Sequence, residues 1–342
     1  MKLHTLIGSS ILASSLLFAS TGNDLAQKAT SAGLKAIPTD KAELAKLTDP
    51  KGIVTPERVE LGKKLYFEPR LSKSEIISCN TCHNLGIGGV DGVEAAVGHN
   101  WTANPHHLNS PTVYNAVFAQ RQFWDGRSPD LEDQAMGPTL AAPEMAATPE
   151  LIEKRVTSMP EYVAEFKKAY GDDVKIDFKT IAQTIGIFER TLVTPSRFDD
   201  FLNGKQDALT DAEKEGLATF IDMGCTACHT GVALGGGMQK FPLVKPYKYA
   251  NVGDFKGDKN GMVKVPTLRN ITETTPYFHN GAIWSLKEAV QEMGRTQLGK
   301  EISDADAQKI VTFFGALKGR KPAIKYPQLP TITDKTPKPD FK

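Results

Sequence analysis

All four cysteines of this 342-residue chain fall in two copies of one short pattern, Cys-x-x-Cys-His. The first copy runs from Cys79 to His83 and the second from Cys225 to His229. This spacing is typical of covalent c-type haem attachment, in which the thiols bond to the macrocycle and the adjacent histidine ligates the iron. The repeat therefore predicts two haems, attached through Cys79, Cys82, His83, Cys225, Cys228 and His229.

Two other roles for paired cysteines fit this sequence less well. A lone Cys-x-x-Cys serves as a redox dithiol in some proteins and as half of a zinc site in others. The histidine that directly follows both pairs argues against each role. A zinc site made from all four cysteines would need the two motifs to converge, and it would leave both histidines without a function.

Length and charge narrow the class of protein. The chain is long enough for two domains, and one motif in each half predicts one haem per domain. The net charge of +1 gives no reason to expect a nucleic-acid partner.

The N-terminus has the pattern of a secretory signal. Residues 1–21 have a polar start, a short apolar stretch rich in serine, and small residues suited to cleavage. An uncleaved membrane anchor is the alternative, although the stretch is short for a span. Because covalent haem attachment in bacteria takes place outside the cytoplasmic membrane, we expect a cleaved signal peptide and a periplasmic protein.

Helix signals dominate the rest of the chain. Capping residues such as Thr55, Thr148 and Ser303 precede apolar helical patterns, and Thr210 with Glu213 forms a capping box. The fold class is predicted to be mainly α: two cytochrome c-like domains with long loops and little strand. We place these domains at residues 22–196 and 197–342, the second with an extended tail. The predicted helices are 24–34, 40–47, 56–66, 149–156, 160–170, 178–193, 211–221, 285–293 and 303–317.

Each haem iron needs two axial ligands or one open position. His99, in the Gly-rich loop after the first motif, can bind and leave; a surface or propionate-binding role is its alternative. His106 and His107 are expected to be polar loop residues. The methionine candidates are Met238, Met262 and Met293, of which Met293 ends a capped helix; core filling is the alternative for each.

Three further residues lie between the two motifs. Trp124 could carry electrons, although a core position is the more ordinary role for a tryptophan. Gln134 and Glu144 bring polar groups into an apolar stretch, and a glutamate in a haem pocket could move protons. On the sequence alone, a surface position for Glu144 stays the simpler interpretation.

Seven segments, in order, match one known family. Through them the chain resembles the bacterial dihaem cytochrome c peroxidases over nearly all of its mature length. The segments are CNTCHNLGIGGVDG at 79–92, QFWDGR at 122–127, LEDQAMGP at 131–138, GCTACHTG at 224–231, VPTLRN at 265–270, TPYFHNGAIWSLKEAV at 275–290 and MGRTQLG at 293–299.

The resemblance implies distinct roles for the two haems. The N-terminal haem would be the low-potential, peroxidatic one, with His99 as a dissociable distal ligand and Gln134 and Glu144 acting on peroxide. The C-terminal haem would be the high-potential site of electron entry, with Met293 as its second ligand. Trp124 would lie between the haems.

The resemblance also implies a calcium ion at the domain interface. Asn109 and the backbone carbonyls of Thr274 and Pro276 would hold it, which suits the preference of calcium for oxygen ligands. The loop from His99 to Asn109 is about two residues longer than the family pattern.

The expected activity is reduction of hydrogen peroxide to water with electrons from a small periplasmic cytochrome c or cupredoxin, by an enzyme that forms a homodimer. One alternative is a non-catalytic dihaem electron carrier. Another is a dihaem oxidase that modifies a protein substrate, although in that group a tyrosine replaces the methionine seen here at position 293.

Overall fold

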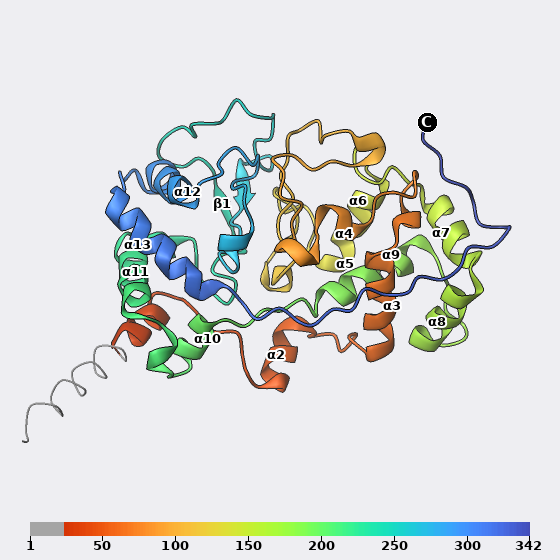
Figure 1. Ribbon diagram of the computed structural model, residues 1–342, viewed down its shortest axis with the longest axis horizontal. Helices are drawn as coiled ribbons and strands as arrows, with labels where there is room; N and C mark the ends of the chain where they lie inside the picture. Colours follow the sequence, from red (N-terminus) through yellow and green to blue (C-terminus); the bar gives the residue numbers. More distant parts are fainter. Residues whose placement is uncertain (1–23) are drawn as a thin grey trace, which may run out of the picture.

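The computed structural model describes residues 24–342, and the predicted signal peptide and its cleavage site lie outside the described residues. The described chain is mainly helical (Figure 1), as predicted. Its one two-stranded sheet is antiparallel and joins β1 (Met238–Lys240) to β2 (Met262–Lys264), with Gln239 opposite Val263. No helix within residues 24–342 is both long and apolar enough to cross a bilayer.

One hydrophobic core lies among helices of the first half of the chain. Apolar side chains at helical spacing, such as Leu61, Leu65, Ile181 and Ile185, are buried against one another. A Cβ at Gly62 would lie 2.2 Å from the backbone oxygen of Thr184, so only glycine allows the close contact of two of these helices. The helices are α3 (Pro56–Tyr66), α7 (Pro149–Thr157), α8 (Pro160–Tyr170) and α9 (Phe178–Glu189).

A second core lies among helices of the second half. Phe198, Phe220 and Phe313 are at its centre. A Cβ at Gly216 would lie 2.1 Å from the backbone oxygen of Lys309, which repeats the close helix contact of the first core. These helices are α10 (Arg197–Leu202), α11 (Asp211–Asp222), α12 (Leu286–Met293) and α13 (Asp304–Phe314).

The remaining helical segments are short and lie outside these two groups. Residues 24–31 are helical, as expected, and the first haem motif itself forms a single turn. The sequence did not predict the short helices that carry polar residues toward this motif. The labelled elements are α2 (Lys41–Thr48), α4 (Cys79–Cys82), α5 (Leu131–Gln134) and α6 (Met136–Leu140).

Both ends of the described chain cross to the opposite half. Ala29 and Leu34 are buried in the second core, although they precede the first haem motif. The tail after residue 320 runs back along α3 and α7 (Figure 1), where the Pro330 carbonyl accepts a hydrogen bond from Arg70. The domain boundary near residue 196 stays a prediction, and each half contributes a segment to the packing of the other.

Candidate functional site

Both motif histidines are held in the orientation that an iron ligand needs. Nδ1 of His83 lies 2.9 Å from the Pro111 carbonyl oxygen, and Nδ1 of His229 lies 3.0 Å from that of Leu234. Because a carbonyl only accepts, Nδ1 carries the proton in each ring and Nε2 is the nitrogen left to bind a metal. Burial lowers the pKa of both histidines, which favours the neutral imidazole that ligates iron.

The cysteines do not have the environment of a redox dithiol. Burial raises the pKa of Cys82 to about 12 and that of Cys225 to about 11, whereas reactive thiols have lowered values. All four thiols are free of disulfides. Among the described residues no three His, Cys, Asp or Glu side chains gather into a metal site.

The first motif borders a cavity of about 930 Å³, a volume that includes the part open to solvent. Cys82 and His83 line it, and Gln134 from the end of α5 and Glu144 line it as well. Burial raises the pKa of Glu144, and the charge of Arg127 acts in the opposite direction. The structure therefore brings both polar pocket residues to the first haem motif.

His99 lies beside this cavity without lining it. Its backbone N–H donates to the Glu144 carbonyl at 2.7 Å, and its Nδ1 is buried without a hydrogen-bond partner. The preceding residue, Gly98, does line the cavity. His99 thus follows directly, in sequence, a residue that lines the cavity. Its imidazole does not line the cavity together with Gln134 and Glu144.

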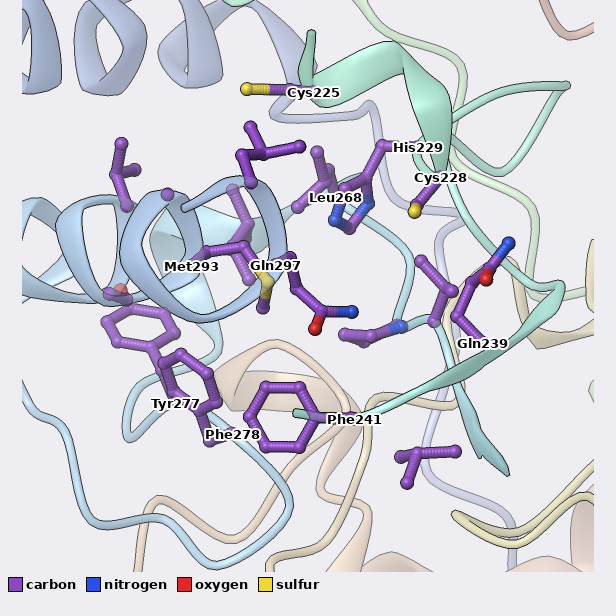
Figure 2. A pocket seen from close by; sticks show the side chains of 18 of the residues that line it. Cys225, Cys228, His229, Gln239, Phe241, Leu268, Tyr277, Phe278, Met293 and Gln297 are labelled. Atoms are coloured by element: carbon purple, nitrogen blue, oxygen red, sulfur yellow. The ribbon is translucent and has the colours of Figure 1, made fainter. Parts of the chain in front are cut away.

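The second motif borders a cavity of about 1090 Å³ with a mainly apolar lining. Figure 2 shows the His229 ring and the Met293 sulfur both directed into this cavity. Met293 is the last residue of α12. The other two methionine candidates, Met238 and Met262, belong to the sheet and are not among the lining residues. A motif histidine and a thioether thus face the same cavity, as the two ligands of one haem iron would.

Trp124 lies between the two sites and lines both cavities. It is 8% exposed, and its Nε1 donates to the Asn109 carbonyl at 2.9 Å. Its ring meets that of His279 edge-on, with the centroids 6.3 Å apart. This is a fixed, buried position between the two motifs.

The three predicted calcium positions line one cavity of about 650 Å³ between the halves. Asn109 comes from the first half, and Thr274 and Pro276 come from the second. The Asn109 amide donates to the Val93 carbonyl at 2.8 Å, so its amide oxygen is the atom available to a cation. The oxygen donors suit calcium, although none of the three residues is a carboxylate.

Comparison with known proteins identifies the family. The family model for di-haem cytochrome c peroxidase matches residues 56–207, and that for cytochrome c matches residues 213–318. The chain is 46% identical to cytochrome c551 peroxidase of Pseudomonas aeruginosa over 298 residues, which cover 84% of this chain and 86% of that protein. The chain belongs to the di-haem cytochrome c peroxidase family.

Other relatives agree with this assignment. The peroxidase is 48% identical to cytochrome c551 peroxidase of Nitrosomonas europaea over 297 residues, 83% of this chain and 88% of that one. It resembles the crystal structure of a MauG-like protein associated with microbial copper homeostasis, with a TM-score of 0.68 and 25% identity. That match covers 78% of this chain and 90% of the other. Family membership and the two motif sites together support two bound haems.

This peroxidase contains a local repeat that was not among the predictions from its sequence. Segments 109–126 and 264–281 share a Pro-Thr pair, an Asn, a Phe and a Gly at equal spacing. Asn115 and Asn270 both have φ of 61°, which is the left-handed region. In this register Trp124 is equivalent to His279, and Asn109 to Lys264. The common spacing was the signal that could have revealed the repeat.

The two repeats exchange hydrogen bonds. The backbone N–H of Asn109 donates to the His279 carbonyl at 2.8 Å, and that of Lys264 donates to the Trp124 carbonyl at 2.7 Å. Each half is thus joined to the other by the same bond at equivalent positions. Lys264, together with the buried Glu189 and with Arg127, lines the first cavity and was not predicted as a site residue.

Proposed function

We propose that this peroxidase reduces hydrogen peroxide to two waters, with two protons and two electrons taken one at a time from a small periplasmic cytochrome c or cupredoxin. The observation that carries the proposal is the placement of Gln134 and Glu144 in the cavity of the first haem motif. The names of the relatives from Pseudomonas aeruginosa and Nitrosomonas europaea support the reaction class. An electron carrier would have no use for a half-buried acid in this cavity.

The haems, when bound, supply the redox chemistry, and the residues of the chain set the conditions for it. Cys79 and Cys82 would hold the first haem, with His83 as its ligand. His229 and Met293 would hold the second, and a Met/His pair raises the potential relative to a His/His pair. The buried place of Trp124 between the two cavities supports a role in electron transfer between them.

Glu144 acts as the acid and base. Because burial raises the pKa of Glu144, its protonated form persists closer to neutral pH than that of an exposed glutamate. It can therefore give a proton to the peroxide oxygen that leaves as water. Gln134 donates through its amide and orients the peroxide.

The loop that contains His99 would act as a switch. We propose that His99 is a dissociable distal ligand, and its place one residue beyond the cavity lining supports a short path in and out. Calcium held by Asn109, Thr274 and Pro276 would stabilise the junction of the domains 22–196 and 197–342. We also propose that the signal peptide is cleaved and that the enzyme forms a homodimer.

Steady-state oxidation of a reduced small cytochrome c by peroxide tests the function. We expect turnover by the wild type, measured on both the fully oxidised and the half-reduced enzyme. Glu144→Gln should lower kcat by about 10²–10⁴-fold, the usual contribution of a general acid or base. Glu150→Gln, an exposed carboxylate at the start of α7, is the matched control and should keep full activity.

Two results would count against the proposal. Unchanged turnover in Glu144→Gln would remove the acid–base role. A wild type that does not oxidise the cytochrome in either redox state would favour the electron carrier.

The relative named methylamine utilization protein MauG, from Methylorubrum extorquens, is 33% identical over 305 residues, 81% of this chain and 82% of that one. A protein-modifying reaction is not our proposal, because Met293 lines the second cavity.

A further inference from the structure

Lys264 is a buried cation with no ionic partner. It is 8% exposed, and among residues 24–342 its Nζ forms neither a hydrogen bond nor an ion pair. Asp125 is the one acid whose charge acts on its pKa, and the Asp125 carboxylate is already engaged by Arg127 Nη1 at 2.9 and 3.0 Å. A charge removed from water without a counterion is costly, so this position calls for an anion.

The strand geometry shows which cavity the side chain faces. Successive side chains of a strand point to opposite faces. Val263 and Val265, on either side of Lys264, both line the second haem cavity. Lys264 borders this cavity as well, but the alternation along the strand directs its side chain to the face opposite Val263 and Val265. It also lines the first haem cavity, and its backbone N–H is bonded to the Trp124 carbonyl.

The first haem cavity, which Lys264 lines, holds acidic side chains as well. The two acids that line the same cavity, Glu144 and Glu189, make no ion pair with Lys264 within the described chain. The protein itself thus supplies no counterion on the side of the cavity that Lys264 faces.

A haem is apolar except for its two propionate carboxylates, which are the anions that a loaded cavity would bring to this position. We propose that Lys264 Nζ binds a propionate of the N-terminal haem, so that a residue of the C-terminal half completes the N-terminal haem site. The bond from the Lys264 N–H to the Trp124 carbonyl fixes the backbone from which the side chain extends. The inference depends on the two haem sites and not on peroxide reduction.

The proposed contact gives Lys264 a role in setting the potential of one haem. A cation near the N-terminal haem favours its ferrous form, because reduction adds a negative charge to the site. The C-terminal haem, on the other face of the strand, is affected less. Lys264 is thus a positioning and tuning residue for the first haem.

Spectroelectrochemical titration of the holoprotein tests this assignment. Lys264→Met removes the charge and keeps the length of the side chain. It should shift the reduction equilibrium of the N-terminal haem toward the ferric form about tenfold, about 59 mV for a one-electron couple, and that of the C-terminal haem less. Lys264→Arg, which keeps the positive charge, should keep the potential of the N-terminal haem close to the wild-type value. The propionate bending bands in the resonance Raman spectrum should change in Lys264→Met as well.

The control is Lys240→Met, which removes an exposed lysine from β1 of the same sheet and should leave both potentials unchanged. If Lys264→Met accumulates no holoprotein, Lys264→Gln against Lys264→Arg gives the same comparison. An unchanged potential of the N-terminal haem, or a larger shift at the C-terminal haem, overturns the proposal. These readouts need no peroxide turnover, so loss of the proposed activity would not imitate failure of the contact.

Discussion

Glu189 is the clearest example of a single residue whose charge state is set by its surroundings. It ends α9, is 4% exposed, and its Oε2 has no hydrogen-bond partner. Burial, with the nearby charge of Glu132, raises the pKa of Glu189 to about 8. At neutral pH the carboxyl is therefore mostly protonated in the folded state.

This raised pKa predicts a pH dependence of stability. Between the unfolded value of about 4.3 and the folded value of about 8, the folded state binds more protons than the unfolded state. The free energy of unfolding therefore falls as pH rises through this window. Glu189→Gln removes the titration, so its thermal midpoint should fall less than that of the wild type between pH 6 and pH 8. The thermal midpoint of Glu150→Gln should depend on pH as that of the wild type does. An equal pH dependence of the midpoint in the wild type and both variants would refute the raised pKa of Glu189.

At the scale of elements, a buried arginine helps to tie α7 to the C-terminal tail. The Arg155 side chain is fully buried, and its guanidinium donates to the Arg70 carbonyl at 2.9 Å and to the Ser72 carbonyl. It also donates to the Lys338 carbonyl at 2.9 Å, which lies in the tail.

Arg155→Met should therefore destabilise the protein. The change leaves several buried carbonyls without a donor, and breaking a buried charged network of this kind costs about 3–5 kcal/mol. Urea unfolding followed by far-UV circular dichroism measures the loss. Limited proteolysis should also cut the tail sooner. The exposed neighbour Lys154→Met is the control. Wild-type stability in Arg155→Met would show that the tail is held by other contacts.

Elements with strong local signals were predictable from the sequence. The Thr55 hydroxyl accepts from the Arg58 N–H at 3.3 Å, and the capping box of Thr210 and Glu213 is formed as predicted. The short helices α5 and α10 and the three-residue strands were missed, because a few residues carry no periodicity. Their positions depend on packing against distant segments.

Some residues of the candidate site were likewise predictable from the sequence, and others were not. The motif spacing identifies the histidines that face the cavities, since ligand and attachment residues are adjacent in sequence. Trp124 and Lys264 meet only because two repeats far apart in the chain exchange hydrogen bonds, and no local pattern encodes that contact. The position of His99 outside its cavity likewise depends on the fold of a long loop.

For the whole molecule, the junction between the halves is built from buried polar groups. The Asn115 and Asn270 amides both donate to the Thr194 hydroxyl, at 2.7 and 2.9 Å, and all three residues are almost completely buried. Equivalent positions of the two repeats thus meet at the segment that links the halves. A junction satisfied by such specific bonds favours one relative placement of the two haem sites.

The cavity beside this junction predicts a calcium dependence of the whole molecule. Because Asn109 lies in one half and Thr274 and Pro276 in the other, an ion bound to all three would stabilise only the assembled form. Calcium at 100 times its Kd should add about 2.7 kcal/mol to stability, and a chelator should lower both the thermal midpoint and peroxide turnover. Asn109→Ala should weaken this response, whereas magnesium should not replace calcium. A thermal midpoint and a turnover that chelation leaves unchanged would rule out the calcium site.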